Sequence, residues 1–111
     1  MGNMILGTDS RYKAGIYYIG GIVPESAPLE VEPAIFAQRI TIPMLMLNGE
    51  LDFIFPVGTG QRPLFELLGS PPEHKEWILY PDVTHEIPES VRDDFIRATL
   101  RWLDTYLGRV E

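Results

Sequence analysis

The feature that most constrains the fold of this chain is a nearly continuous apolar run at residues 42–47 (IPMLML). A strand that is apolar on both of its faces belongs inside a sheet that helices cover on both sides, which is typical of parallel sheets. Two further strands are indicated at residues 13–19 (KAGIYYI) and 76–80 (EWILY), because both runs are rich in β-branched and aromatic residues. The chain is therefore expected to contain a small sheet with a doubly covered central strand.

Helical segments are predicted between these strands. Residues 1–6 indicate the last turns of a helix that ends in a left-handed cap at Gly7. A short helix is predicted over residues 33–39, because its opening proline suits a first helical position. A third is predicted over residues 60–68, with a proline in its first turn and Gly69 as its cap. Such alternation predicts an α/β fold with about three mostly parallel strands, joined by right-handed crossovers and flanked by helices.

The final helix has the strongest periodic pattern. It is predicted to begin at Ser90, because Ser90 and Asp93 form an S-x-x-D capping pattern. Its apolar residues form two neighbouring stripes, one with Val91, Phe95, Trp102 and Tyr106 and the other with Ile96, Leu100, Leu103 and Leu107. Together the stripes cover an arc of about 200°. An arc that wide predicts packing against more than a single face of a sheet.

The size and charge of the chain narrow the possible partners. A length of 111 residues predicts one domain that covers residues 1–111. Nine Lys and Arg residues against sixteen Asp and Glu residues give a net charge of −7. That charge argues against nucleic acid and against an anionic membrane as partners, because binding to either requires a basic patch. The chain has no cysteine, which excludes disulfides and cysteine-ligated metals and agrees with a cytoplasmic location.

Two predicted loops bring together residues that can carry chemistry. Functional residues of open parallel sheets gather just beyond the carboxyl ends of the strands. The loop after residues 42–47 contains Glu50 and Asp52, and the loop after residues 76–80 contains His85. A carboxylate that accepts the imidazole Nδ1–H fixes the tautomer of the ring and leaves Nε2 free to take a proton from a hydroxyl. The two loops therefore predict half of a system that activates a nucleophile.

The same residues resemble a known family. Residues 42–57 (IPMLMLNGELDFIFPV), followed by His85, resemble the C-terminal half of an α/β-hydrolase domain, closest to the branch of dienelactone hydrolases and prolyl-oligopeptidase-like esterases. The resemblance covers roughly residues 1–108 and implies that Asp52 is the catalytic acid and His85 the catalytic base, in the order that this fold uses. It implies hydrolysis of a carboxylic ester or a related acyl bond, with no cofactor. No metal site is predicted, because residues 85–89 (HEIPE) do not form an H-E-x-x-H motif and contain a proline.

The chain departs from the family pattern at the nucleophile. In this fold the nucleophile lies in a G-x-S-x-G elbow between a strand and a helix, upstream of the acid. The four serines are Ser10, Ser26, Ser70 and Ser90, and none of them lies in that motif. The opening residues 1–7 resemble the helix that follows the elbow. We therefore expect a partial α/β-hydrolase fold that lacks the N-terminal half with the nucleophile elbow and the oxyanion hole, and that is inactive alone.

Several alternatives for the candidate residues stay open at this point. Asp52 is also a common residue type for a turn after a strand, and His85 is equally compatible with a loop histidine bonded to local backbone. Glu50 is a second candidate for the acid. Phe53 and Phe55 are expected to be packing residues, or else walls of an acyl pocket in an intact enzyme.

A half domain also predicts partners. The strand at residues 13–19 would present an unpaired edge, and missing helices would leave an apolar patch exposed. We therefore expect a homodimer, a higher oligomer or a complex with a complementary N-terminal half. A small ester or acyl substrate is expected only when the nucleophile half is supplied. The alternative function is a non-catalytic oligomerising or interaction module derived from a hydrolase.

Overall fold

The computed structural model describes residues 2–21 and 36–108 of the chain. Its elements are α1 (Gly2–Thr8), β1 (Gly15–Tyr18), β2 (Met44–Gly49), the π-helix η2 (Val57–Gln61), α3 (Arg62–Leu67), the 3₁₀-helix η3 (Pro72–His74), β3 (Lys75–Tyr80) and α4 (Glu89–Leu107). The three strands form one parallel sheet in the order β1-β2-β3. The predicted α/β fold with parallel strands is thus confirmed. Of the helix predicted at residues 33–39, residues 33–35 lie outside the described residues, residues 36–37 are helical and residues 38–39 form a turn.

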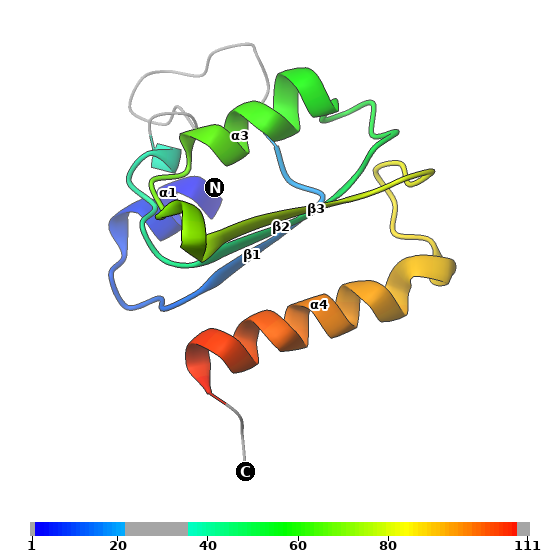
Figure 1. Cartoon of the computed structure of the whole chain (residues 1–111). Helices are drawn as coiled ribbons and strands as arrows, with labels where there is room; N and C mark the ends of the chain where they lie inside the picture. Colours follow the sequence, from blue (N-terminus) through cyan, green and yellow to red (C-terminus); the bar gives the residue numbers. More distant parts are fainter. Residues whose placement is uncertain (1, 22–35, 109–111) are drawn as a thin grey trace.

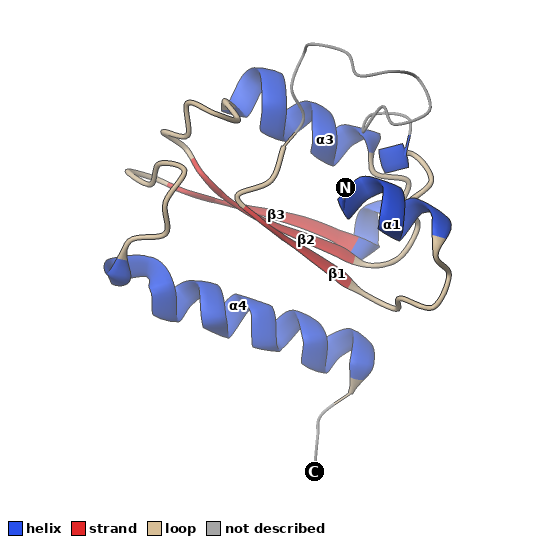
Figure 2. Ribbon diagram, turned by 180° about the vertical axis from the view of Figure 1, so that it is seen from behind, coloured by secondary structure: helices blue, strands red, loops and turns tan. Residues whose placement is uncertain are grey.

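The sheet lies between two helical layers. Figure 1 shows α1 and α3 on one face of the sheet and α4 on the other, and Figure 2 shows the same arrangement from behind. Every residue of β2 is buried, as predicted for a strand that is apolar on both sides. Met44 and Met46 join the core under α3, whereas Leu45 and Leu47 join the core under α4. The alternating directions of the strand side chains thus build two cores from one apolar run.

Two glycines have a different function from the predicted one. Gly7 lies inside α1, Gly69 follows α3, and neither has the positive φ of a left-handed cap. A Cβ atom on Gly7 would lie 2.8 Å from the carbonyl oxygen of Phe36, and one on Gly69 would lie 2.3 Å from that of Gln38. The predicted caps are therefore wrong, because both glycines instead allow the backbone at residues 36–38 to pass close by.

Two helix boundaries also differ from the prediction. Helix α4 begins before Ser90, with Pro88 as its N-cap and no side-chain capping bond. The predicted capping pattern is wrong because Ser90 already lies inside the first turn. The helix predicted at residues 60–68 begins earlier, as η2, and continues as α3 with Pro63 in its first turn as expected.

No helix within the described ranges is both long enough and apolar enough to cross a membrane.

Only one of the two apolar stripes of α4 is buried against described residues. Phe95 and Trp102 pack on the sheet and are at most 7% exposed. In the second stripe, Ile96 is 48% exposed, Leu100 54% and Leu107 56%. The predicted packing of this wide apolar arc against more than the sheet is therefore not found within the part of the chain that the structure describes.

A partly buried tyrosine on β1 makes stability depend on pH. The hydroxyl of Tyr17 donates a hydrogen bond to Oδ1 of Asn3 on α1, and burial raises the pKa of Tyr17 to about 12. The folded state holds this proton more tightly than the unfolded state. The contribution of Tyr17 to stability is therefore fully present below pH 10 and is lost as the pH rises from 10 to 12. The rise in this pKa corresponds to a loss of at most about 2.7 kcal/mol at high pH, and solvent screening of the partly exposed ring makes the loss smaller.

Replacing Tyr17 by phenylalanine is expected to remove this alkaline loss. The variant should be about 1 kcal/mol less stable than wild type at pH 8, because the hydrogen bond to Asn3 is lost. Urea unfolding of both proteins at pH 8 and pH 11 measures the difference. Tyr12→Phe is the matched control, since Tyr12 is 44% exposed and should leave the alkaline loss unchanged. An equal alkaline loss in Tyr17→Phe would contradict the assignment.

Candidate active site

The predicted acid and histidine meet at one edge of the sheet. Asp52 follows β2 and His85 follows β3, and these strands are parallel neighbours whose carboxyl ends lie side by side. Nδ1 of His85 lies 2.7 Å from Oδ2 of Asp52. This is the distance of a strong hydrogen bond to a carboxylate. The two residues that were predicted to act together are thus in direct contact, although they are far apart in the sequence.

The carboxylate of Asp52 is buried and held in one orientation. Its side chain is completely inaccessible to solvent. Oδ1 accepts hydrogen bonds from the backbone N–H groups of Ile54 (2.8 Å) and Phe55 (2.9 Å), so that Oδ2 is left to face His85. Asp is well suited to this arrangement because its short side chain bonds the backbone two or three residues further on. We call residues 49–55 the acid turn.

The acid turn is joined directly to the loop that carries His85. The N–H of Glu50 donates to the carbonyl of Tyr80 (3.0 Å), and the N–H of Leu51 donates to the carbonyl of Val83 (2.9 Å). Gly49 allows this contact, because a Cβ atom there would lie 2.2 Å from the carbonyl oxygen of Val83. Val83 itself is 2% exposed and anchors the loop in the core. The two loops therefore hold each other in register.

The histidine ring is partly open to solvent. The side chain of His85 is 28% exposed, and its ring centroid lies 5.6 Å from that of Phe55 at a tilt of 52°. Since Nδ1 donates its proton to Asp52, the neutral ring has an unprotonated Nε2. No described residue hydrogen-bonds to that nitrogen. The arrangement can therefore accept a proton at Nε2 while Asp52 stabilises the imidazolium that forms.

The structure separates the alternatives that the sequence left open. Glu50 is exposed and the contact with His85 is made by Asp52, so that Asp52 is the candidate for the acid of this pair. Phe55 packs on the histidine as expected, but Phe53 is 79% exposed, and its predicted packing role is not met by the described residues. Across residues 2–21 and 36–108, no group of three or more His, Asp or Glu residues is arranged to hold a metal ion.

Two buried amides were not singled out from the sequence. The side chain of Asn48 donates to the carbonyl of Gly20 (2.8 Å), and that of Gln61 donates to the acid turn. Both side chains are completely buried. The only available signal was a polar residue at the end of an apolar run or at the start of a helix, which is too common to indicate a buried site.

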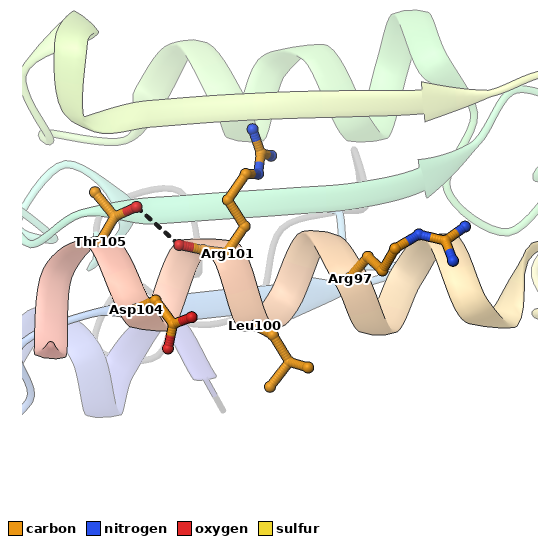
Figure 3. A pocket seen from close by; sticks show the side chains of 5 residues that line it. All are labelled: Arg97, Leu100, Arg101, Asp104 and Thr105. Atoms are coloured by element: carbon orange, nitrogen blue, oxygen red, sulfur yellow. Dashed lines mark hydrogen bonds between the residues drawn. The ribbon is translucent and has the colours of Figure 1, made fainter. Parts of the chain in front are cut away.

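A separate surface groove lies on α4. It has a volume of about 650 Å³ and is lined by Arg97, Leu100, Arg101, Asp104 and Thr105 (Figure 3). In this view Arg101 points toward β3, where Nη2 lies 2.8 Å from Oε2 of Glu76, and Leu100 points away from that strand. Neither residue of the Asp52–His85 pair lines the groove.

Comparison with known proteins supports the fold. No protein-family model matches the sequence, and no curated protein matches it. Among solved structures, a cold-adapted esterase from an Arctic intertidal metagenomic library matches with a TM-score of 0.72 and 20% identity, over 96% of this chain and 42% of the esterase. A protein of Klebsiella pneumoniae assigned as a dienelactone hydrolase matches with a TM-score of 0.77 and 21% identity, over 94% of this chain and 47% of that protein.

A third similar structure is a monoacylglycerol lipase from Paleococcus ferrophilus. It is 34% identical, with a TM-score of 0.55, over 66% of this chain and 28% of the lipase. The chain thus spans about half the length of the esterase and of the Klebsiella protein. The resemblance that was predicted from residues 42–57 and His85 is confirmed at the level of the fold. This chain has part of an α/β-hydrolase fold, with three parallel strands between flanking helices.

Proposed function

We propose that this chain supplies the acid and the base of a serine hydrolase that cleaves carboxylic esters or related acyl bonds. The observation that carries the proposal is the 2.7 Å contact between His85 Nδ1 and Asp52 Oδ2 at the carboxyl edge of a parallel sheet. Ligand and catalytic sites of open α/β sheets lie at this edge. The structural similarity to esterases supports the same reaction class.

In the proposed reaction, Asp52 orients the imidazole and His85 transfers the proton. Nε2 of His85 removes the proton of a serine hydroxyl while the serine oxygen attacks the acyl carbon. Asp52 stabilises the resulting imidazolium without taking the proton itself. His85 then gives the proton to the leaving alcohol, and the acyl group stays bonded to the serine. Water attacks this acyl group in the same way, which releases the carboxylic acid and regenerates the serine hydroxyl. The two backbone bonds to Asp52 Oδ1 hold the carboxylate for both steps.

The serine of this reaction is proposed to come from outside the present sequence. Ser70 is buried and its hydroxyl donates to the carbonyl of Ile42, whereas Ser10 and Ser90 lie exposed in a turn and in the first turn of α4. Ser26 lies outside the described residues. None of the four follows the G-x-S-x-G pattern, which places the nucleophile above the sheet.

The 111-residue chain alone is therefore expected to have no esterase activity that depends on His85. Loss of a serine nucleophile lowers turnover on the order of 10⁶-fold in subtilisin. Purified chain and its His85→Gln variant should hydrolyse a p-nitrophenyl ester at the same background rate, and a fluorophosphonate probe should label neither. Co-expression with the polypeptide encoded directly upstream should restore labelling. Robust turnover by the chain alone that His85→Gln abolishes would contradict the assignment of the nucleophile.

A second function, as a binding module, is supported by an unpaired surface. Strand β1 pairs only with β2 within the described residues, so that its other edge has no described partner. Tyr18 on β1 is 47% exposed, and its hydroxyl lies 2.6 Å from Oγ1 of Thr99 on α4. By the helical period, Ile96 and Leu100 lie on the flank of α4 that continues beyond Thr99. The open strand edge and the exposed stripe therefore lie on the same side of the molecule.

We propose that this surface binds the nucleophile-bearing half of the hydrolase domain, on the same polypeptide or on a second one. Such a half would add a parallel strand to β1 and an apolar helix to the stripe of α4. A second copy of this chain is the other occupant that the surface admits. The complementary half is favoured because the chain spans about half of the structures that it matches.

Replacing Leu100 by glutamate is expected to weaken this association at least about tenfold, because the interface would lose a buried leucine and gain an unpaired charge. Sedimentation of the chain alone and with the upstream polypeptide measures both kinds of complex. Thr105→Glu is the matched control, since Thr105 is exposed on the opposite flank of α4. Equal association of wild type and Leu100→Glu would exclude the stripe as the interface.

A further inference from the structure

Gln61 is a buried polar side chain that the proposed reaction does not use. Gln61 is the last residue of the π-helix η2 and has no exposed surface. Its Nε2 donates hydrogen bonds to the carbonyl oxygens of Gly49 (2.9 Å) and Phe55 (2.8 Å). These carbonyls are the two ends of the acid turn. One side-chain nitrogen therefore ties the start of the turn to its end.

The bond to Phe55 continues directly to the catalytic carboxylate. The N–H of Phe55 donates to Asp52 Oδ1 (2.9 Å), while its carbonyl accepts from Gln61 (2.8 Å). Phe55 is thus held from both sides of its backbone, and its ring packs on that of His85. Asp52 and His85 share a bond through the other carboxylate oxygen. The chain of contacts Gln61–Phe55–Asp52–His85 is unbroken.

The local backbone is arranged to bring Gln61 inward. The N–H groups of Gly60 (2.8 Å) and Gln61 (3.1 Å) both donate to the carbonyl of Pro56, as expected where a π-helical turn accommodates an extra residue. Such turns are frequent at functional sites. The Oε1 atom of Gln61 is buried and has no partner among the described residues. Because an apolar side chain of similar size would avoid that unpaired oxygen, packing alone does not explain a glutamine here.

We propose that Gln61 is the positioning residue of the acid turn, which holds Asp52 in the orientation that receives His85 Nδ1–H. Without its two donated bonds, the carbonyl of Phe55 would be left unpaired, the carbonyl of Gly49 would keep only the 3.3 Å bond from the N–H of Asp52, and the turn would open toward water. The role rests on the proposed function, because the orientation of Asp52 matters for chemistry only if His85 acts as a base. The contact itself can be tested without any turnover.

The test follows the Nδ1 proton of His85 by NMR in the isotopically labelled chain. A proton that an imidazole donates to a buried carboxylate gives a far-downfield signal and exchanges slowly with water, and Asp52→Asn identifies the signal by removing it. Gln61→Met keeps the approximate shape of the side chain but cannot donate. We expect this variant to lose the signal or to show at least about tenfold faster exchange of the proton.

Two controls separate positioning from general loss of stability. Gln38→Met changes the other glutamine, which is exposed, and Leu64→Val weakens the core beneath α3 without touching the acid turn. Both should keep the wild-type signal and its exchange rate. A folded Gln61→Met variant with the wild-type signal and exchange rate would overturn the proposal. So would a change of equal size in Leu64→Val, because it would show that any loss of packing has the same effect.

If Gln61→Met does not fold, hydrogen exchange in the wild-type chain still tests the positioning role. The side-chain NH₂ protons of Gln61 are expected to exchange slowly, and their exchange should rise in step with that of the His85 proton as denaturant is added below the unfolding transition. Fast exchange of the Gln61 protons beside a protected His85 proton would refute the positioning role. These readouts do not depend on a nucleophile, so that failure here leaves the proposed hydrolase function to its own test.

Discussion

Replacing Gly49 by alanine is expected to destabilise the protein by more than about 3 kcal/mol, which is severe for a single methyl group. The new Cβ atom would lie 2.2 Å from the carbonyl oxygen of Val83 and 2.5 Å from that of Thr84. Both are backbone atoms, so that no side chain can rotate away. Relief would require the loop of His85 to move and would break the bond between the Leu51 N–H and the Val83 carbonyl.

Urea unfolding followed by circular dichroism measures this effect. Gly58→Ala is the matched control, because a Cβ atom at Gly58 would meet nothing within 4 Å. The control should change stability by no more than about 1 kcal/mol and in the stabilising direction, since alanine is the better helix former. Unfolding of Gly49→Ala at the wild-type midpoint would mean that the two loops are not packed as closely as the structure shows.

Replacing Asp52 by asparagine is expected to lower turnover on the order of 10³–10⁴-fold in the proposed complex with a nucleophile-bearing polypeptide. Asparagine is nearly the same size, and its Oδ1 can still accept from the N–H groups of Ile54 and Phe55. Its Nδ2 donates instead of accepting, however, so that it cannot receive the proton of His85 Nδ1. The ring would then carry its proton on Nε2, where the serine proton must go.

Glu50→Gln is the matched control for this variant. It removes the same charge from the same turn, but Glu50 is exposed and makes no contact with His85 that would fix the tautomer. Its kcat/KM for a p-nitrophenyl ester should stay within about twofold of wild type, because a screened surface charge contributes little. Turnover that survives in Asp52→Asn and is lost in Glu50→Gln would transfer the role of acid to Glu50.

The order of elements and the meeting of acid and base could both be predicted from local pattern. A short and nearly continuous apolar run such as residues 42–47 is typical of a strand that is covered on two faces. Once the strands are parallel, loops that follow neighbouring strands must share one edge. A carboxylate from the loop of Glu50 and Asp52 could therefore be paired with His85 from their positions after two predicted strands, whereas the choice of Asp52 came from the family resemblance.

Other features could not be inferred because they depend on segments that are distant in the chain. Gly7 and Gly69 have the local sequence of helix caps, yet both are glycine because the backbone at residues 36–38 passes close to them. Gln61 looks like an ordinary helical glutamine until the packed helix brings it against both ends of the acid turn. Periodicity and turn chemistry reflect the conformation of neighbouring residues, whereas close approach and burial arise only when separate elements pack together.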